Sequence, residues 1–233
     1  MKYTLLFTIS IFCASLAMKA QESTETVSDS IQVQKQKYGL RIGGDISKLA
    51  RTAFEKGYSG FEIVGDLRFY KKFYAAAEIG NETRDWDEDN LKATISGSYF
   101  KIGADYNAYN NWVGMNNAIT AGLRYGFATF SEELTRYPIY TTNTIFPTEI
   151  RTEPLEFNNL NASWVEFILG VKTEVFTNLY VGINVQVKRM VSNKTPDNFD
   201  NLIVPGFNRT YDFSEFGVGY GYSLSYLIPI VKR

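Results

Sequence analysis

The sequence predicts an all-β protein, an eight-stranded antiparallel up-and-down transmembrane β-barrel. Three observations support this fold class. Eight runs in which every second residue is apolar follow one another between Tyr38 and the C-terminus. Short turns and long polar loops join these runs in alternation, which places both termini on one side. Five of the six prolines lie in two of the long loops, where no hydrogen bond of a strand ladder is lost.

The first 20 residues are expected to form a signal peptide that is cleaved on secretion. Lys2 supplies a positive charge, residues 3–16 form a largely apolar stretch, and Ala20 places a small residue before Gln21. The apolar stretch is shorter than the roughly 20 residues that a mature membrane helix needs. Residues 21–37 are polar and are expected to form a disordered periplasmic tail, so the barrel is assigned to residues 38–233.

The first four strands are expected at residues 38–46, 61–69, 73–79 and 99–106. In the first of them, Leu40 and Ile42 alternate with Arg41, and the apolar face continues to Ile46. A short turn at residues 71–72 joins the second strand to the third. An acidic loop at residues 85–90 separates the third strand from the fourth, and a turn at residues 109–111 follows.

The last four strands are expected at residues 119–127, 165–175, 181–188 and 216–228, with the fifth beginning near Trp112. Thr177 and Asn178 form a hairpin turn between the sixth strand and the seventh. Residues 131–162 carry three prolines and are interpreted as an elaborate loop, part of which can extend the strands. Residues 192–210 form a second long loop, and both loops are expected to be a variable display surface.

Alternation alone does not decide which face points inward, because a soluble lipocalin-like barrel buries its apolar face. The polar face here mixes charges of both signs with Gly, Ala and Ser, which suits a crowded interior better than a solvated surface. Aromatic residues gather beside the short turns, as at Phe69, Phe73, Tyr106 and Tyr180, which is typical of the girdle of a membrane barrel. We therefore expect lipid outside and an inner charge network of Arg41, Asp45, Glu62, Asp66, Arg68, Glu78, Lys101, Asp105, Arg124, Glu166, Lys172, Glu174 and Lys188.

A barrel of eight strands is only wide enough for its own side chains to fill it. The inner charges are then expected to form a salt-bridge network that plugs the lumen, since an unpaired buried charge costs several kcal/mol. The alternative is a narrow porin-like conduit for ions or small solutes through that network. A soluble periplasmic lipocalin-like binding barrel is the second alternative.

Enzymatic activity is not expected. The chain has no histidine, and its one cysteine, Cys13, lies in the predicted signal peptide, so no nucleophile and base can be paired. No catalytic or cofactor-binding residues are assigned, and no cofactor is expected. The formal net charge of -1 offers no electrostatic basis for binding nucleic acid.

One acidic segment resembles the start of a calcium-binding loop, with carboxylates at Asp85, Asp87 and Asp89. The match ends there, because Asn90 stands where glycine is needed and Ser96 where the closing glutamate belongs. These residues are a weak candidate metal site, and the simpler interpretation is a solvated acidic loop near divalent ions that bridge lipopolysaccharide.

Residues 19–21 and the segments 38–45, 60–66, 77–81 and 226–230 carry a family resemblance across the whole mature chain. They resemble the small outer-membrane β-barrel proteins of Bacteroidota bacteria, and specifically one of their uncharacterised families. The resemblance implies location in the cell outer membrane and contact with its lipid and lipopolysaccharide. It also implies assembly by the barrel-insertion machinery. A monomer is expected, and the resemblance names no surface partner.

Overall fold

The computed structural model describes residues 37–109, 117–139, 149–196, 199–211 and 213–232 of the 233-residue chain. The predicted signal peptide and polar tail lie outside these residues, except that Lys37 begins the first strand one residue earlier than expected. The expected start of the fifth strand near Trp112 also lies outside them.

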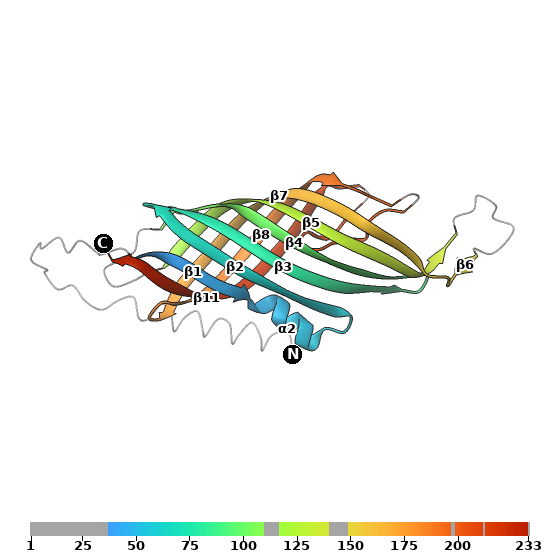
Figure 1. The fold of residues 1–233 in the computed structure, drawn as a ribbon, viewed down its shortest axis with the longest axis horizontal. Coiled ribbons are helices and arrows are strands. Elements are labelled where there is room, and N and C mark those ends of the chain that lie inside the picture. Colours follow the sequence, from blue (N-terminus) through green and yellow to red (C-terminus); the bar gives the residue numbers. More distant parts are fainter. Residues whose placement is uncertain (1–36, 110–116, 140–148, 197–198, 212, 233) are drawn as a thin grey trace, which may run out of the picture. The chain divides into compact units, whose positions relative to one another are not determined.

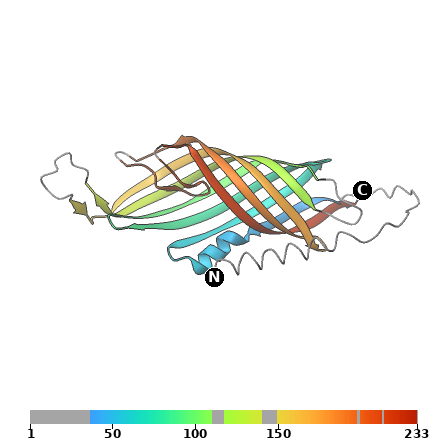
Figure 2. The ribbon, with the colours of Figure 1, turned by 180° about the vertical axis from the view of Figure 1, so that it is seen from behind.

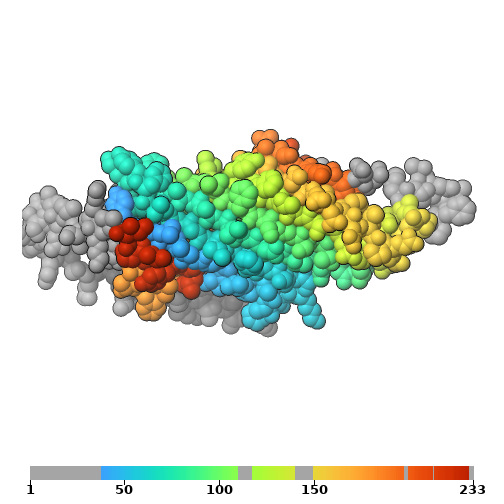
Figure 3. All heavy atoms as spheres, viewed as in Figure 1, coloured from blue at the N-terminus to red at the C-terminus, as the bar shows by residue number. Residues whose placement is uncertain are grey.

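Eight antiparallel strands form a ring (Figures 1 and 2). These strands are β1 (Lys37–Asp45), β2 (Tyr58–Tyr70), β3 (Phe73–Glu88), β4 (Leu91–Asn107), β5 (Ala118–Pro138), β7 (Leu155–Phe176), β8 (Leu179–Asn193) and β11 (Phe216–Lys232). Each pairs with the next in this order, and pairing of β1 with β11 closes the ring. The prediction of an all-β antiparallel fold built on eight strands is confirmed. In Figure 3, β2 to β5 (cyan to green) lie side by side in a continuous wall.

Side chains alternate between the inside and the outside of the ring. On β4, Lys101 is 2% exposed and Asp105 is 5% exposed, whereas Ile102 is 59% exposed. On β8, Lys188 is 3% exposed and Val187 is 51% exposed. The apolar face of the strands therefore points away from the ring, and the charged face points into it.

Toward the long-loop end, the polarity of the two faces is reversed: the inward face is apolar and the outward face is polar. On β5, the inward residues Ala128, Phe130 and Leu134 are at most 3% exposed, while Thr129 and Ser131 on the outward face are polar. The buried apolar residues of this end form one cluster, which we call the loop-end core. It consists of Ala93, Ile95, Tyr99, Ala128, Phe130, Leu134, Leu160, Ala162, Trp164, Ile203, Val204 and Phe207.

Two of the expected loops are strands for much of their length. β5 continues to Pro138, β6 (Ile150–Arg151) pairs with its end, and β7 begins at Leu155, so the expectation that part of residues 131–162 extends the strands is confirmed, and these described parts are not loop. The acidic segment is likewise part of the β3–β4 hairpin, with only Asp89 and Asn90 between the strands. In both places, burial of apolar side chains in the loop-end core favours continued pairing.

The segment between β8 and β11 folds back into the ring. β9 (Ile203–Val204) pairs with β10 (Asn208–Arg209), and Phe207 packs edge-on against Trp164 with 5.9 Å between ring centroids. Gly206 has a φ of +78°, and a Cβ there would lie 2.6 Å from the ring of Tyr99. We call residues 201–207 the inward loop. The expectation that all of residues 192–210 form a display surface is therefore wrong, because the inward loop is largely buried.

The first strand ends earlier than expected, and Ile46 begins a helix, α2 (Ile46–Phe54). Asp45 caps this helix by accepting hydrogen bonds from the backbone N–H of Ser47 at 2.7 Å and from its hydroxyl at 2.6 Å. Pairing of β1 stops at Ser223 of β11 and Ile63 of β2. Beyond these residues, α2 takes the place of a strand. Within the described part of the chain, no helix has the length and apolar character to cross a bilayer.

Candidate functional site

Lys101 of β4 lies at the centre of the charged interior. Its ammonium group is 2.7 Å from Glu78, 3.3 Å from Glu62 and 3.7 Å from Glu166. These carboxylates come from β3, β2 and β7, so one cation links three different strands to its own. Because the Lys101 side chain is 2% exposed, its charge is balanced by protein carboxylates rather than by water.

Two further clusters belong to the charged interior. Arg124 of β5 lies 2.8 Å from Asp105 and 3.3 Å from Glu78, which joins it to the Lys101 cluster. Asp66 of β2 is shared by two cations, with Arg41 at 2.6 Å and Lys172 at 2.7 Å. The Arg124 cluster links the consecutive strands β3, β4 and β5, whereas the Asp66 cluster also links β2 to β7 on the opposite side of the ring.

The charged interior is joined to the inward loop at the base of the loop-end core. Lys188 donates a hydrogen bond to the carbonyl oxygen of Gly206 at 2.7 Å and lies 3.7 Å from Glu166. The indole N–H of Trp164 donates to Glu166 at 3.2 Å. The backbone N–H of Gly206 donates to Glu82 at 3.0 Å. Both polar groups of the Gly206 backbone thus hold the inward loop to interior charges.

Glu82, Lys48 and two tyrosines that contact the interior carboxylates were not predicted from the sequence. Glu82 forms an ion pair with Lys48 of α2 and accepts a hydrogen bond from Tyr58 at 2.9 Å. Tyr99 donates to Glu62 at 2.6 Å. Glu82 lies four residues after Glu78 and shares its strand face, so a longer third strand would have included it. Lys48 gave no such signal, because the helix itself was not expected.

Four residues singled out from the sequence have other roles. Asp45 is buried but caps α2, and Glu174 accepts from the backbone N–H of Asn178 in the β7–β8 turn at 2.6 Å. Arg68 donates to the carbonyl oxygen of Lys71 in the β2–β3 turn at 2.5 Å. Tyr180 was expected in the outer aromatic girdle, but it is 4% exposed and lies under the guanidinium of Arg41, which corrects that expectation.

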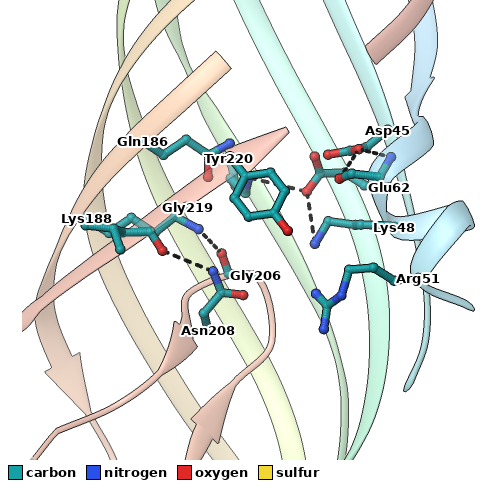
Figure 4. Close-up of a pocket in the computed structure, with 13 residues that line it drawn as sticks. Asp45, Lys48, Arg51, Glu62, Gln186, Lys188, Gly206, Asn208, Gly219 and Tyr220 are labelled. Atoms are coloured by element: carbon teal, nitrogen blue, oxygen red, sulfur yellow. Dashed lines mark hydrogen bonds and ion pairs between the residues drawn. The ribbon is translucent and has the colours of Figure 1, made fainter. Parts of the chain in front are cut away.

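Two polar cavities adjoin the charged interior of the ring. The larger, of about 210 Å³, is bounded by α2 and β11, with Lys101 and Lys188 at its inner side; Figure 4 shows Lys48 and Arg51 facing Tyr220 across it. The smaller, of about 50 Å³, lies among Glu78, Asp105, Arg124 and Lys172. Both are smaller than the roughly 300–1,000 Å³ of typical small-molecule sites. They suit water and small ions better than an organic ligand.

The acidic segment does not gather into a cation site. Asp85 accepts a hydrogen bond from Thr94 at 2.9 Å, and Asp87 pairs with Lys92 at 2.8 Å, both across the β3–β4 hairpin. Asp85, Asp87 and Asp89 are all exposed. Among the described residues, no group of three or more acidic, histidine or cysteine side chains is placed to hold a metal ion.

One buried carboxylate lies apart from the ion pairs, in the loop-end core. Glu132 of β5 is 1% exposed, and among the described residues no side chain donates to its oxygens. Burial raises its pKa to about 7, and the backbone of Leu202 offsets part of this rise. Its cross-strand neighbours are Ile95 and Phe157, which are apolar.

Comparison with known proteins gives a family but no activity. No curated protein matches the sequence. Among solved structures, the chain is similar to Ail, the attachment invasion locus protein of Yersinia pestis, with 10% sequence identity and a TM-score of 0.39 over 84% of this chain and 99% of that chain. A likeness of this degree supports no conclusion about function. The family model for a domain of unknown function, DUF6048, matches residues 1–233, and the chain belongs to that family.

Proposed function

We propose that the protein is an outer-membrane β-barrel with a structural or surface-interaction role, whose lumen is closed by side chains. The observation that carries this proposal is a belt of large apolar side chains on the outside of the ring. Every strand contributes, and the representatives of β1 to β11 in order, each 41% to 64% exposed, are Ile42, Ile63, Ile79, Ile102, Leu123, Leu169, Ile183 and Leu224. Soluble monomers rarely expose apolar patches above a few hundred Å², so a belt that encircles the ring supports a lipid environment.

At the edge of the belt nearer the long loops, polar residues face outward on adjacent strands. Asn81 of β3 pairs with Ser98 of β4, which pairs with Thr129 of β5, which pairs with Asn161 of β7. The amide of Asn81 donates to the hydroxyl of Ser98 at 2.9 Å. Beyond this row the ring has polar residues outside and the loop-end core inside. That reversal suits a segment that projects from the membrane into water.

The closed lumen is supported by two features of the interior. The charges of the Lys101 and Asp66 clusters pair across the ring, and the inward loop fills its loop end with Val204 and Phe207. An eight-stranded barrel has an interior just wide enough for side chains. A structural or surface-interaction role follows more readily from this arrangement than transport does.

A narrow conduit for ions or small solutes is the second candidate. It is favoured by the two polar cavities, both of which are lined by Asp45, Glu62 and Gln186. Water and ions could use such a path if the intervening ion pairs separate. Recording current across a planar bilayer distinguishes the two candidates, because only a conduit gives reproducible conductance steps.

The membrane environment has its own test. The full chain, expressed and isolated in detergent, is expected to migrate differently on a gel before and after heating and to precipitate when detergent is removed. A chain that stays soluble without detergent and migrates identically in both samples would favour the soluble lipocalin-like barrel. The outward belt argues against that alternative, which requires apolar residues inside the middle of the ring.

Activity and partners are expected to follow from the same arrangement. We expect no enzymatic activity, since central interior carboxylates such as Glu78 and Asp105 already pair with cations. The expected contacts are outer-membrane lipid, lipopolysaccharide and the barrel-insertion machinery, and the expected state is a monomer. Interaction with other surface molecules would involve the projecting hairpins β3–β4 and β5–β7, because they extend beyond the polar row.

A further inference from the structure

The helix α2 turns its polar side toward the ring. Thr52 donates to the carbonyl oxygen of Gly60 at 2.9 Å and accepts from its backbone N–H at 2.8 Å. The guanidinium of Arg51 lies 3.7 Å from the ring centroid of Tyr58. Lys48 forms its ion pair with Glu82 in the interior. Polar contacts, rather than apolar packing, therefore hold this helix against the ring.

The apolar side of α2 points away from the ring. Ile46, Leu49 and Phe54 are 41%, 54% and 89% exposed, and no residue of the helix is buried. A surface helix of a soluble protein does the opposite, because it buries its apolar stripe against the core. Burial by some other molecule is needed to account for the helical spacing of these apolar residues.

The exposed side of α2 is continuous with the belt. The helix packs against β2 and β11. On β2, the outward residues Phe61 and Ile63 are each 48% exposed; on β11, Tyr220 and Tyr222 are 64% and 46% exposed. The layer that covers the belt on both sides of the helix would therefore also cover Leu49. This continuity favours acyl chains over a second copy of the chain or another protein as the covering material.

The helix also lies where the wall of the ring is incomplete. β1 pairs with β2 only as far as Ile63 and with β11 only as far as Ser223, so Tyr58–Glu62 and Phe216–Tyr222 lack a β1 partner. The cavity of about 210 Å³ lies behind this part of the wall, with Lys48 and Arg51 on the α2 side and Tyr220 on the β11 side (Figure 4). A lipid-facing gap at this position would expose interior charges to hydrocarbon, which is costly.

We propose that α2 is an interfacial helix that lies in the outer leaflet, with Ile46, Leu49 and Phe54 among the acyl chains and Lys48 and Arg51 closing the gap in the wall. The inference rests on the proposed function, since it requires that the belt face lipid. Interfacial helices commonly place an apolar face about 5–10 Å into the boundary between headgroups and acyl chains. A position in the membrane interface then explains both why the apolar residues of α2 are exposed and why polar contacts hold the helix to the ring.

Site-directed fluorescence in vesicles tests the helix directly. Cys13 is the one cysteine of the chain, so a Cys13→Ala background leaves a single introduced thiol for a bimane label. The test positions are Leu49→Cys and Phe54→Cys. The control for the belt is Ile79→Cys, and the control for water is Asp87→Cys on the exposed part of the β3–β4 hairpin. Each labelled chain is folded into dioleoylphosphatidylcholine vesicles with and without brominated acyl chains, and only variants with a heat-modifiable band are used.

Loss of fluorescence in brominated vesicles at Leu49, Phe54 and Ile79, but not at Asp87, is the expected result. Quenching at Ile79 without quenching at either helix position would overturn the inference and leave the proposed function intact. Cross-linking of copies through an unquenched Leu49→Cys thiol would assign the face to a second copy and would also overturn it. Absence of quenching at Ile79 as well would contradict the proposed function itself.

Discussion

Replacement of Glu132 by leucine is expected to make the protein more stable at alkaline pH and to change the pH dependence of its unfolding. Glu132 is 1% exposed in the loop-end core, beyond the polar row that ends the belt. Leucine is close in size and suits the surroundings of Ile95 and Phe157. The substitution removes a buried carboxyl group while leaving little empty space.

The sign of the effect follows from the raised pKa. Burial moves the pKa of Glu132 from 4.5 to about 7, so between these values the folded chain keeps a proton that the unfolded chain releases. Stability from this group is therefore full below pH 4.5 and falls as the pH rises to about 7. At about 1.4 kcal/mol per pKa unit, the loss between pH 5 and pH 8 amounts to about 2 to 3 kcal/mol.

The assay is urea unfolding of the detergent-folded protein, followed by tryptophan fluorescence at pH 5 and pH 8. The substitution Glu132→Leu is expected to raise the free energy of unfolding above that of the parent at pH 8. This increase is expected to be about 2 to 3 kcal/mol larger at pH 8 than at pH 5. Glu133→Leu is the matched control, because Glu133 is the next residue and lies on the outward face. If the free energy of unfolding of Glu132→Leu differs from that of the parent by the same amount at both pH values, Glu132 is not buried and protonated in the folded state.

Substitutions at three further positions test other parts of the structure by the same unfolding assay. Arg124→Ala removes the partner of Asp105 and is expected to cost about 3–5 kcal/mol; an unchanged midpoint would mean that the interior is wet. Phe207→Ala is expected to cost about 3–5 kcal/mol, since it empties the contact with Trp164, and a neutral effect would mean that the inward loop is not docked. Asp45→Ala is expected to cost about 1 kcal/mol through loss of the α2 cap, and Asp45→Asn should recover most of it.

The middle of each strand could be predicted from the sequence because its two faces differ consistently. Ile102 and Lys101, for example, are adjacent in sequence, and the structure places them 59% and 2% exposed. The turns at residues 71–72 and 177–178 were also predictable; Asn178 has a φ of +66°, a conformation that Asn tolerates better than most residues. The alternation of apolar and polar residues was sufficient to predict a strand wherever each of its two faces met a single environment.

The strand ends could not be predicted, because along one strand the apolar residues change from the outward face to the inward face. Beyond Phe127 of β5, the outward residues Thr129 and Ser131 are polar and the inward residue Phe130 is apolar. A pattern search that expects one polarity per face interprets this exchange as the end of the strand. The prolines of residues 131–162 strengthened that error, although Pro138 lies at the last position of β5.

The helix and the inward loop were missed for different reasons. Ile46 is in phase with the apolar face of β1, so its alternation with Asp45 resembled a longer strand, even though Asp45 and Leu49 also fit a capped helix. The inward loop gives no local signal, because Gly206 lies against Tyr99 and Phe207 packs on Trp164, and both of these residues come from distant strands. The ion pairs of Lys101 and Arg124 were easier to anticipate, since each of their partners lies on the polar face of a recognisable strand, whereas Lys48 belongs to the helix that was not expected.

We propose a ring that has lipid outside and an interior closed by side chains. Planar-bilayer recording, with protein that shows heat-modifiable migration, tests this claim most directly. The closed interior predicts no conductance steps above those of a protein-free bilayer. Reproducible steps from correctly folded protein would contradict the closed lumen and would favour the narrow conduit.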